Sequence, residues 1–234
     1  MRSVEDELEE VIGLRFEDRS LLNQALTHSS YANEHKSEVI SDNERLEFLG
    51  DAVLELLSSR YLYLHYPSLP EGDLTKLRAS IVCEPTLALC AREMGLPGYI
   101  RLGRGEELTG GRKRNSIVSD ALEALIGAIY LDRGIEEADS FVRRFVLNDI
   151  EHKKLFYDSK TILQEVVRKA FPDEELTYRL IREEGPSHDR HFETQALIGT
   201  NVVGWGRAGT KKGAEMEAAY KALIELKQRG IHVS

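Results

Sequence analysis

The sequence is poor in the features that mark secreted, membrane-spanning and zinc-stabilised proteins. It has two cysteines in 234 residues, Cys83 and Cys90, and they form no CxxC motif, which argues against a disulfide framework or a zinc knuckle. No apolar run approaches the roughly 18–20 residues of a membrane span. The acidic N-terminus, MRSVEDELEE, lacks the basic and apolar regions of a signal peptide. We therefore expect a cytoplasmic protein without a membrane segment.

The formal net charge of −9 is unevenly distributed. Residues 1–150 carry 27 acidic and 17 basic side chains, a net charge of −10, whereas residues 151–234 carry 13 and 14, a net charge of +1. The total alone argues against a polyanionic partner, since nucleic acids attract basic surfaces. The uneven distribution removes that objection, because basic clusters in the second segment can still bind a polyanion.

The apolar pattern divides the chain into two domains. Within residues 1–150, apolar residues recur at helical spacing and no stretch alternates as a strand, which predicts an all-α helical bundle. The polar segment 151–157 is interpreted as a linker. Residues 158–230 predict a small α+β domain in the order α-β-β-β-α, with helices at 160–170 and 214–227 and strands at 176–183, 192–198 and 202–208.

Two acidic patterns occur in the first domain. On a helix, Glu44, Glu47 and Asp51 lie at i, i+3 and i+7 and form one acidic stripe. Asp120 and Glu123 lie one turn apart in a strongly apolar helix, where burial of unpartnered carboxylates costs free energy. If the two helices pack face to face, the carboxylates form a hard-cation site suited to Mg²⁺ or Mn²⁺.

Each acidic pattern taken alone is also consistent with a solvated helix face, and the residues by themselves leave that alternative open. A di-iron carboxylate bundle is a different kind of metal site, which needs Glu-x-x-His on two helices, and the sequence contains none. The nucleophile elbow GxSxG, the P-loop and the zinc motif HExxH are also absent, so the acidic residues are the main candidates for chemistry.

The acidic segments resemble those of a known enzyme family. Segment 43–54, NERLEFLGDAVL, closely resembles the signature of bacterial ribonuclease III, and segment 119–132, SDALEALIGAIYLD, is similar to that family's second acidic motif. Further matches follow in the family's order, namely ALTHSS at 25–30, EGDLTKLRA at 71–79, DSKTILQE at 158–165 and KKGAE at 211–215. The resemblance covers essentially the whole chain and implies an RNase III-like helical catalytic domain followed by a double-stranded RNA-binding domain.

The resemblance assigns roles to the acidic side chains. It implies that Asp51 and Glu123 are the catalytic residues. The implied cofactor is Mg²⁺, or Mn²⁺ in its place, and the residues that match the family's metal ligands are Glu47, Asp51, Asp120 and Glu123. Two further residues, Glu44 and Glu71, match auxiliary acidic positions of the family.

The implied enzyme is a homodimer that cleaves both strands of double-stranded RNA. Phe48 matches the aromatic side chain that inserts into a socket on the partner subunit. The family's products carry 5′-phosphates, 3′-hydroxyls and a short 3′ overhang. The implied substrates are ribosomal RNA precursors and messenger and transfer RNAs that are processed or degraded.

The second domain is similar to domains that recognise A-form RNA by its shape. The positions that match RNA contacts lie on the first helix, in the loop after the first strand and at the start of the last helix: Thr161, Gln164, Glu165, His188, Thr210, Lys211 and Lys212. In the first domain, a basic loop is interpreted as a phosphate contact and contains Arg112, Lys113 and Arg114. Ala208-Gly209-Thr210 and Gly213 depart from the family's pattern around the lysine pair, which predicts weaker RNA affinity.

Two other functions stay open. The chain could be a catalytically weak regulator that only binds double-stranded RNA, or a structural dimer of the ribosome-associated kind found among relatives that lack the acidic set or the second domain. Both alternatives are disfavoured here, because all four carboxylates and the second domain are present.

Overall fold

The computed structural model describes residues 3–36, 40–185 and 190–233, so the predicted RNA contact His188 lies outside the described residues. The chain divides into two structural units, Met1–Asn148 and Asp149–Ser234. Each unit is described by itself below. Within the described residues, no helix has both the length and the apolar character needed to cross a membrane.

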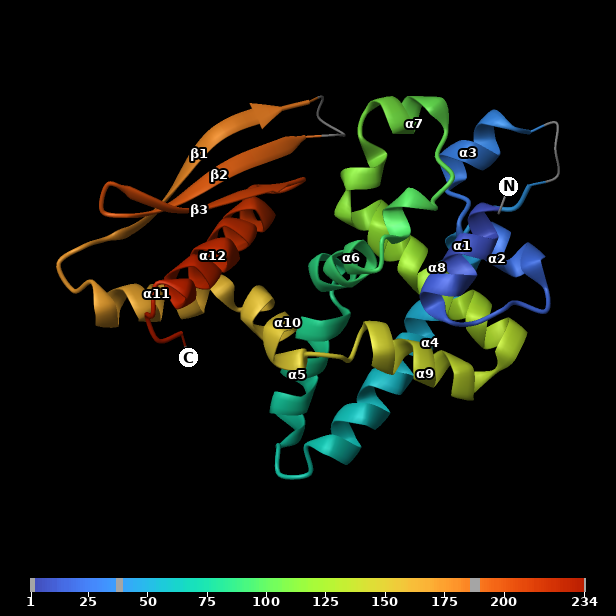
Figure 1. Ribbon diagram of the computed structural model, residues 1–234, viewed down its shortest axis with the longest axis horizontal. Helices are drawn as coiled ribbons and strands as arrows, with labels where there is room; N and C mark the ends of the chain where they lie inside the picture. Colours follow the sequence, from blue (N-terminus) through green and yellow to red (C-terminus); the bar gives the residue numbers. More distant parts are fainter. Residues whose placement is uncertain (1–2, 37–39, 186–189, 234) are drawn as a thin grey trace. The chain divides into compact units, whose positions relative to one another are not determined.

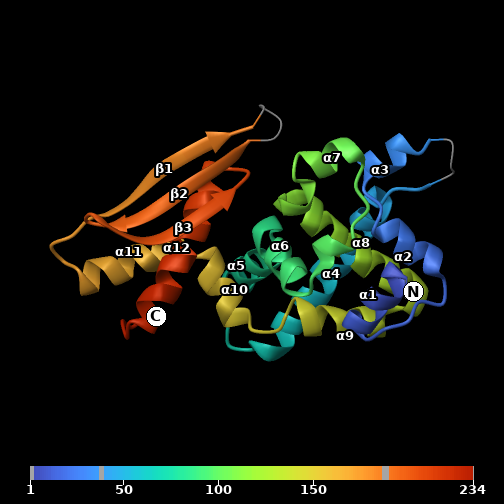
Figure 2. The same cartoon turned by 45° about the horizontal axis from the view of Figure 1, so that its top comes forward.

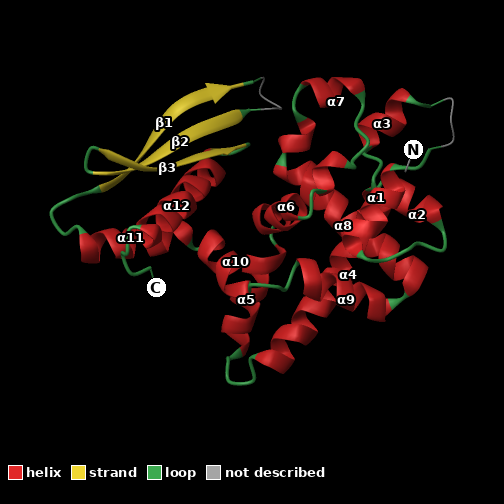
Figure 3. Cartoon of the chain, in the orientation of Figure 1, coloured by secondary structure: helices red, strands yellow, loops and turns green. Residues whose placement is uncertain are grey.

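The first unit is built from helices, as the sequence predicted (Figure 3). Its elements are α1 (Val4–Ile12), α2 (Arg19–Ala25), α3 (Ser29–Glu34), α4 (Glu44–His65), α5 (Glu71–Val82), α6 (Glu84–Glu93), η1 (Leu96–Gly98), α7 (Arg104–Leu108), η2 (Gly111–Lys113), α8 (Asn115–Arg133) and α9 (Ile135–Phe145). In the described part of this unit, strand-like pairing is limited to one bridge between Thr27 and Arg101.

Several helices begin where a side chain accepts a hydrogen bond from a free backbone N–H group. Ser3 and Asp6 form a capping box at α1, in which each side chain accepts from the other residue's backbone N–H at 3.1 Å. At α3, the Nδ1 atom of His28 accepts from the backbone N–H of Ser30 at 3.2 Å. The role of His28 in this structure is therefore to cap a helix.

Helix α8 is the centre of the first unit and packs against α4, α6, α2 and α9. Its apolar side chains are buried around most of its circumference, as expected for a helix that other helices surround. Figures 1 and 2 show α4 and α6 beside α8. Helix α8 therefore determines where its neighbours can place their side chains.

Two glycines let α4 and α8 approach each other closely. A Cβ atom added at Gly50 of α4 would lie 1.8 Å from the backbone oxygen of Glu123, and one added at Gly127 of α8 would lie 2.3 Å from the backbone oxygen of Leu46. The two backbones are thus in direct contact, and no larger residue fits at either position. This contact brings the acidic segment of α4 next to that of α8.

The second unit has the predicted α-β-β-β-α order, preceded by one additional helix. Its elements are α10 (Ile150–Tyr157), α11 (Ser159–Ala170), β1 (Leu176–Glu184), β2 (His191–Ile198), β3 (Asn201–Ala208) and α12 (Lys211–Gln228). The strands form one antiparallel sheet in the order β1-β2-β3. Figures 1 and 2 show α11 and α12 on the same face of this sheet, and Leu163, Ala196, Val203 and Leu223 are part of the core between them.

The structure differs from the sequence-based expectation at two helices. Segment 151–157, expected to be a linker, belongs to α10, and its Phe156 is buried against Tyr220 of α12 with ring centroids 5.1 Å apart. This aromatic contact stabilises a helix that the polar composition of the segment did not reveal. The last helix begins at Lys211 rather than 214, because the hydroxyl of Thr210 caps it by accepting from the backbone N–H of Gly213 at 3.0 Å.

The substitution Gly50→Ala tests the close contact between α4 and α8. The added methyl would overlap a backbone oxygen, so we expect the free energy of unfolding to fall by about 1–3 kcal/mol or more, as measured by urea denaturation. Gly72→Ala on α5 is the matched control, since a Cβ there meets nothing within 4 Å and alanine favours a helix by about 0.5–1 kcal/mol. Equal stability of the two variants would refute the contact.

Candidate metal and catalytic site

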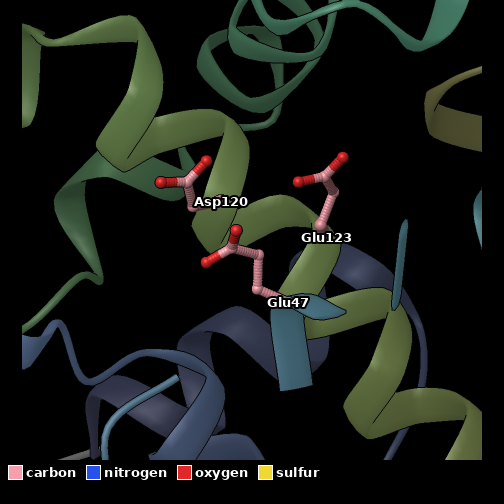
Figure 4. A group of neighbouring side chains, drawn as sticks. All are labelled: Glu47, Asp120 and Glu123. Carbon is pink, nitrogen blue, oxygen red and sulfur yellow. The ribbon is translucent and has the colours of Figure 1, made fainter. Parts of the chain in front are cut away.

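The contact between α4 and α8 brings three carboxylates together. Glu47 extends from α4, and Asp120 and Glu123 extend from α8, which is the arrangement that Figure 4 shows. One oxygen from each carboxylate lies within 4.8 Å of the others. All three side chains are half-buried. The structure therefore joins the two acidic patterns that the sequence separates by more than seventy residues.

Asp51 and Glu44 lie at the edge of this three-carboxylate group, on α4 and exposed. Neither contributes an oxygen to the group within 4.8 Å. Both are close enough to act through their charges, because Asp51 helps to raise the pKa of Glu123 and Glu44 helps to raise the pKa of Glu47. Of the four predicted metal ligands, three are thus gathered directly and Asp51 stands beside them.

Burial and mutual repulsion raise the pKa of all three of these carboxyl groups. Burial, followed by the charges of Asp51 and Asp120, raises the pKa of Glu123 to about 8. Burial and the charge of Glu47 raise the pKa of Asp120 to about 6, against the opposing hydrogen bond from Ser119. The pKa of Glu47 is also raised, mainly by burial.

The donor set fits a hard divalent cation. Within the described residues, no lysine or arginine forms an ion pair with Glu47, Asp120 or Glu123, and no cationic side chain contributes to their pKa shifts. Half-buried carboxylates without a cationic partner cost free energy, and a bound metal ion offsets that cost. Oxygen ligands on rigid helices, with open positions for water and phosphate oxygens, are the ligands that Mg²⁺ prefers.

Glu84, at the start of α6, is a nearby acidic residue that was not among the residues predicted for the site. Its side chain is exposed, and its charge contributes to the raised pKa of Asp120. Nothing in the local sequence signals this proximity, since Glu84 follows Cys83 in an ordinary helix-initiating segment. Only the packing of α6 against α8 brings it near.

Glu71 and Phe48, two other predicted site residues, lie outside the three-carboxylate group. Glu71 is exposed in the first turn of α5 and accepts a hydrogen bond from the hydroxyl of Thr75 at 2.8 Å. Phe48 follows Glu47 on α4, and 81% of its surface is exposed. Phe48 borders a hollow of about 640 Å³ that is also lined by Leu21, Gln24, Glu44, Arg45, Leu46, Leu49 and Leu131.

The basic loop is held largely by contacts within the chain. The guanidinium of Arg112 donates to the backbone oxygens of Pro97 and Ile100 at 2.6 and 2.7 Å and pairs with Glu107 at 2.7 Å. Arg114 pairs with Glu106 at 2.8 Å. Lys113 is exposed. Two of the three cations therefore anchor the loop, and Lys113 is the residue of this set that faces solvent.

In the second unit, the predicted duplex contacts on α11 share one exposed face. Thr161, Gln164 and Glu165 lie at i, i+3 and i+4 and are all exposed, whereas Leu163, Val166 and Val167 are buried beneath them. At the start of α12, Lys211 pairs with Glu183 at 3.6 Å and lies 5.6 Å from the ring centroid of Phe192, and Lys212 is exposed. The hydroxyl oxygen of Thr210 accepts a hydrogen bond there from the backbone N–H of Gly213.

Comparison with known proteins defines the class to which these two units belong. Residues 18–150 match the family described as ribonuclease-III-like, and residues 159–226 match the double-stranded RNA binding motif. The first unit is therefore a nuclease domain of the ribonuclease III type and the second is a double-stranded RNA-binding domain.

Whole-chain relatives agree with this class. The chain is 50% identical over 224 residues to Ribonuclease 3 of Enterococcus faecalis, covering 95% of this chain and 97% of that protein. It is 47% identical over 218 residues to Ribonuclease 3 of Oceanobacillus iheyensis, covering 92% and 95%. The nuclease domain of ribonuclease III from Campylobacter jejuni superposes with a TM-score of 0.56 at 43% identity, covering 62% of this chain and 95% of that one. The chain belongs to the ribonuclease III family.

The raised pKa values predict how pH acts on the metal-free protein. Between the ordinary carboxyl range and about pH 8, the folded state keeps protons that the unfolded state has released, so the free energy of unfolding falls as pH rises. Glu123→Gln removes the part of this penalty that belongs to Glu123. We expect the variant to gain thermal stability over wild type in EDTA, by a margin that grows from pH 5 to pH 8.

Thermal denaturation at these pH values, with and without Mg²⁺, measures the effect. Added Mg²⁺ should stabilise the wild type more strongly at pH 8 than at pH 5, because it binds the deprotonated carboxylates. The same substitution at exposed Glu137 on α9 is the control. A margin that is the same at every pH would contradict the assignment of the raised pKa to Glu123.

Proposed function

We propose that this chain hydrolyses phosphodiester bonds of double-stranded RNA at the carboxylate group of α4 and α8, with Mg²⁺ as its cofactor and Mn²⁺ able to replace it. The observation that carries the proposal is the meeting of Glu47, Asp120 and Glu123 within 4.8 Å in a domain of the ribonuclease III type. By its family, the chain is an endoribonuclease of double-stranded RNA.

The carboxylates would work by holding the cofactor and orienting the attacking water. Bound divalent metal supplies a more acidic water and stabilises charge on the leaving 3′ oxygen. Glu47, Asp120 and Glu123 would be ligands from rigid helices, and Asp51, at the exposed edge, would complete the set and face the RNA. Because the leaving atom is the 3′ oxygen, the products would carry 5′-phosphates and 3′-hydroxyls.

The variant Glu123→Gln tests this function. It removes one charge but keeps the side chain's size, so we expect the rate of Mg²⁺-dependent cleavage of a long duplex RNA to fall by about 10²-fold or more. Affinity for the same duplex, measured in EDTA by gel shift, should stay close to that of wild type. Glu137→Gln again serves as the control, and normal cleavage by Glu123→Gln would remove the support for the site.

We also propose that the chain works as a homodimer in which Phe48 packs into the partner. An aromatic side chain with 81% of its surface exposed on a helix is costly in a monomer, and the adjacent hollow offers a place for the same residue of a second copy. The Campylobacter jejuni nuclease domain is described as having a region involved in dimer formation. Two-fold symmetry would give one active site per RNA strand and a short 3′ overhang.

The variant Phe48→Ala should shift the protein from dimer to monomer, because it removes the aromatic anchor of the interface. Analytical ultracentrifugation over a range of concentrations gives the dissociation constant, which we expect to rise about tenfold or more. Leu108→Ala, at an apolar residue of α7 that is 78% exposed, is the control. A monomeric wild-type protein at micromolar concentration would contradict the proposal.

Duplex docking is assigned to the second unit and to Lys113 of the first. Thr161, Gln164 and Glu165 form an exposed helical face suited to 2′-hydroxyls and base edges, and Lys211 and Lys212 lie at a helix N-terminus suited to phosphate. His188 stays a proposed contact on the resemblance, and Arg112 and Arg114 stay proposed phosphate contacts on the basic character of their loop. The implied substrates, ribosomal RNA precursors and messenger and transfer RNAs, follow from the resemblance, whereas the proposed cytoplasmic location rests on the two isolated cysteines and the acidic N-terminus.

A regulator that binds RNA without cleaving it is the alternative function. It is disfavoured because the three-carboxylate group is complete and has the burial and charge expected of a metal site. The cleavage assay with Glu123→Gln separates the two functions, since a regulator would show no metal-dependent cleavage in wild type either.

A further inference from the structure

Among the described residues of the second unit, the helices cover one face of the sheet and leave the other without a helix. We call it the outer face and define it by two cross-strand rows, Arg179–Gln195–Trp205 and Arg182–Glu193–Arg207. Figures 1 and 2 show α11 and α12 together on the opposite side of the sheet. The proposed duplex contacts on α11 and α12 therefore belong to the other side of this unit.

Trp205 is presented on the outer face by its two neighbours on β3. A Cβ at Gly204 would lie 2.1 Å from the backbone oxygen of Ala218, and one at Gly206 would lie 2.0 Å from that of Ala214, so both glycines lie directly against α12. Because side chains alternate along a strand, Trp205 points away from the helix. It is 52% exposed, and it is the one tryptophan of the sequence.

The residues beside Trp205 present hydrogen-bond donors and positive charge. Arg179 donates to Oε1 of Gln195 through Nε at 3.2 Å and Nη2 at 2.7 Å, which fixes its guanidinium in the row of Trp205 with N–H groups left over. In the next row, Arg207 lies 3.5 Å from Glu193, and Arg182 pairs with Glu184 at 3.1 Å. The three arginines, Arg179, Arg182 and Arg207, outnumber the two glutamates, Glu184 and Glu193. This surface is therefore positive, although the net charge of the chain is −9.

This combination matches the chemistry of single-stranded RNA recognition. Unpaired bases stack on exposed aromatic rings of a sheet, and nearby guanidinium groups hold the phosphates that flank the stacked base. Rows of one sheet face lie about 6.6 Å apart along a strand, so Arg207 is within reach of a phosphate next to a base on Trp205. A paired duplex cannot use this surface in the same way, because its bases are already stacked on each other.

We propose that the outer face, with Trp205 as its stacking platform and Arg179 and Arg207 as its phosphate contacts, is a second RNA-binding surface that takes single-stranded RNA. The domain then holds a structured RNA at two places, the duplex stem on α11 and α12 and an unpaired loop or flanking strand on the sheet. This assignment does not depend on cleavage, and it adds a substrate preference for duplexes that carry unpaired segments.

The single tryptophan allows a direct test with the full chain. An oligoadenylate dodecamer is titrated in EDTA at about 50 mM salt, and the intrinsic tryptophan fluorescence, which arises at the outer face alone, is recorded. We expect saturable quenching that persists when the protein is first saturated with duplex RNA. Absence of quenching, or its loss on duplex addition, overturns the proposal.

Variants give an independent readout by fluorescence anisotropy of a labelled oligoadenylate. Trp205→Ala should weaken its affinity about tenfold or more, Trp205→Phe should retain part of it, and Arg179→Glu with Arg207→Glu should abolish it. Tyr157→Ala removes another exposed aromatic of this unit and should leave affinity within about twofold. Unchanged oligoadenylate affinity in Trp205→Ala overturns the proposal. It does so even if the variant loses binding to a protein partner, because the outer face would then bind protein rather than RNA.

These outcomes are separable from those of the cleavage experiments. Affinity for a blunt duplex should be the same in Trp205→Ala as in wild type, since the duplex contacts lie on other elements. Cleavage of a blunt duplex should also be unchanged, whereas a stem with a long unpaired flank should be bound more weakly by the variant. A failed outer-face proposal therefore leaves the nuclease function untouched, and the reverse also holds.

Discussion

Helices α4 and α8 touch backbone to backbone at Gly50 and Gly127, and the chemistry of the first unit depends on that contact. With larger side chains at these positions, the helices would separate and the carboxylate of Glu47 would move away from those of Asp120 and Glu123. The contact also explains why half-buried carboxylates are tolerated, because the apolar packing of α8 fixes them where a divalent cation can neutralise them.

An acidic protein that acts on a polyanion must overcome repulsion between like charges, and here chemistry and RNA binding belong to different units. The first unit collects negative charge at a site whose carboxylates have raised pKa values until a cation is bound, so its affinity for phosphate is linked to the metal. The second unit places exposed cations and hydrogen-bonding side chains on both faces of its sheet, on α11 and α12 on one side and around Trp205 on the other. Binding and chemistry can thus be altered separately.

The sequence alone predicted the helical class of the first unit and the α-β-β-β-α order of the second, because each follows from periodicity, and a dense local motif marked the acidic residues as candidates. It failed where a contact between distant residues decides the structure. Segment 151–157 looked like a linker, since its polar composition does not reveal that Phe156 packs on Tyr220. Nor did the sequence show that Arg112 and Arg114 of the basic loop, which stay proposed phosphate contacts, are held by Pro97, Ile100, Glu107 and Glu106.

The order of charged, apolar and capping residues along the chain determined which residues carry charge, which can be buried and which can start a helix. Only the tertiary structure decided which of them meet: that Glu47 joins Asp120 and Glu123 while Asp51 stays at the edge, that Glu84 approaches Asp120, and that Trp205 faces outward. The reason is physical, since the pKa of a carboxylate and the exposure of an indole are set by neighbours from other helices and strands, which the order of residues along the chain does not specify.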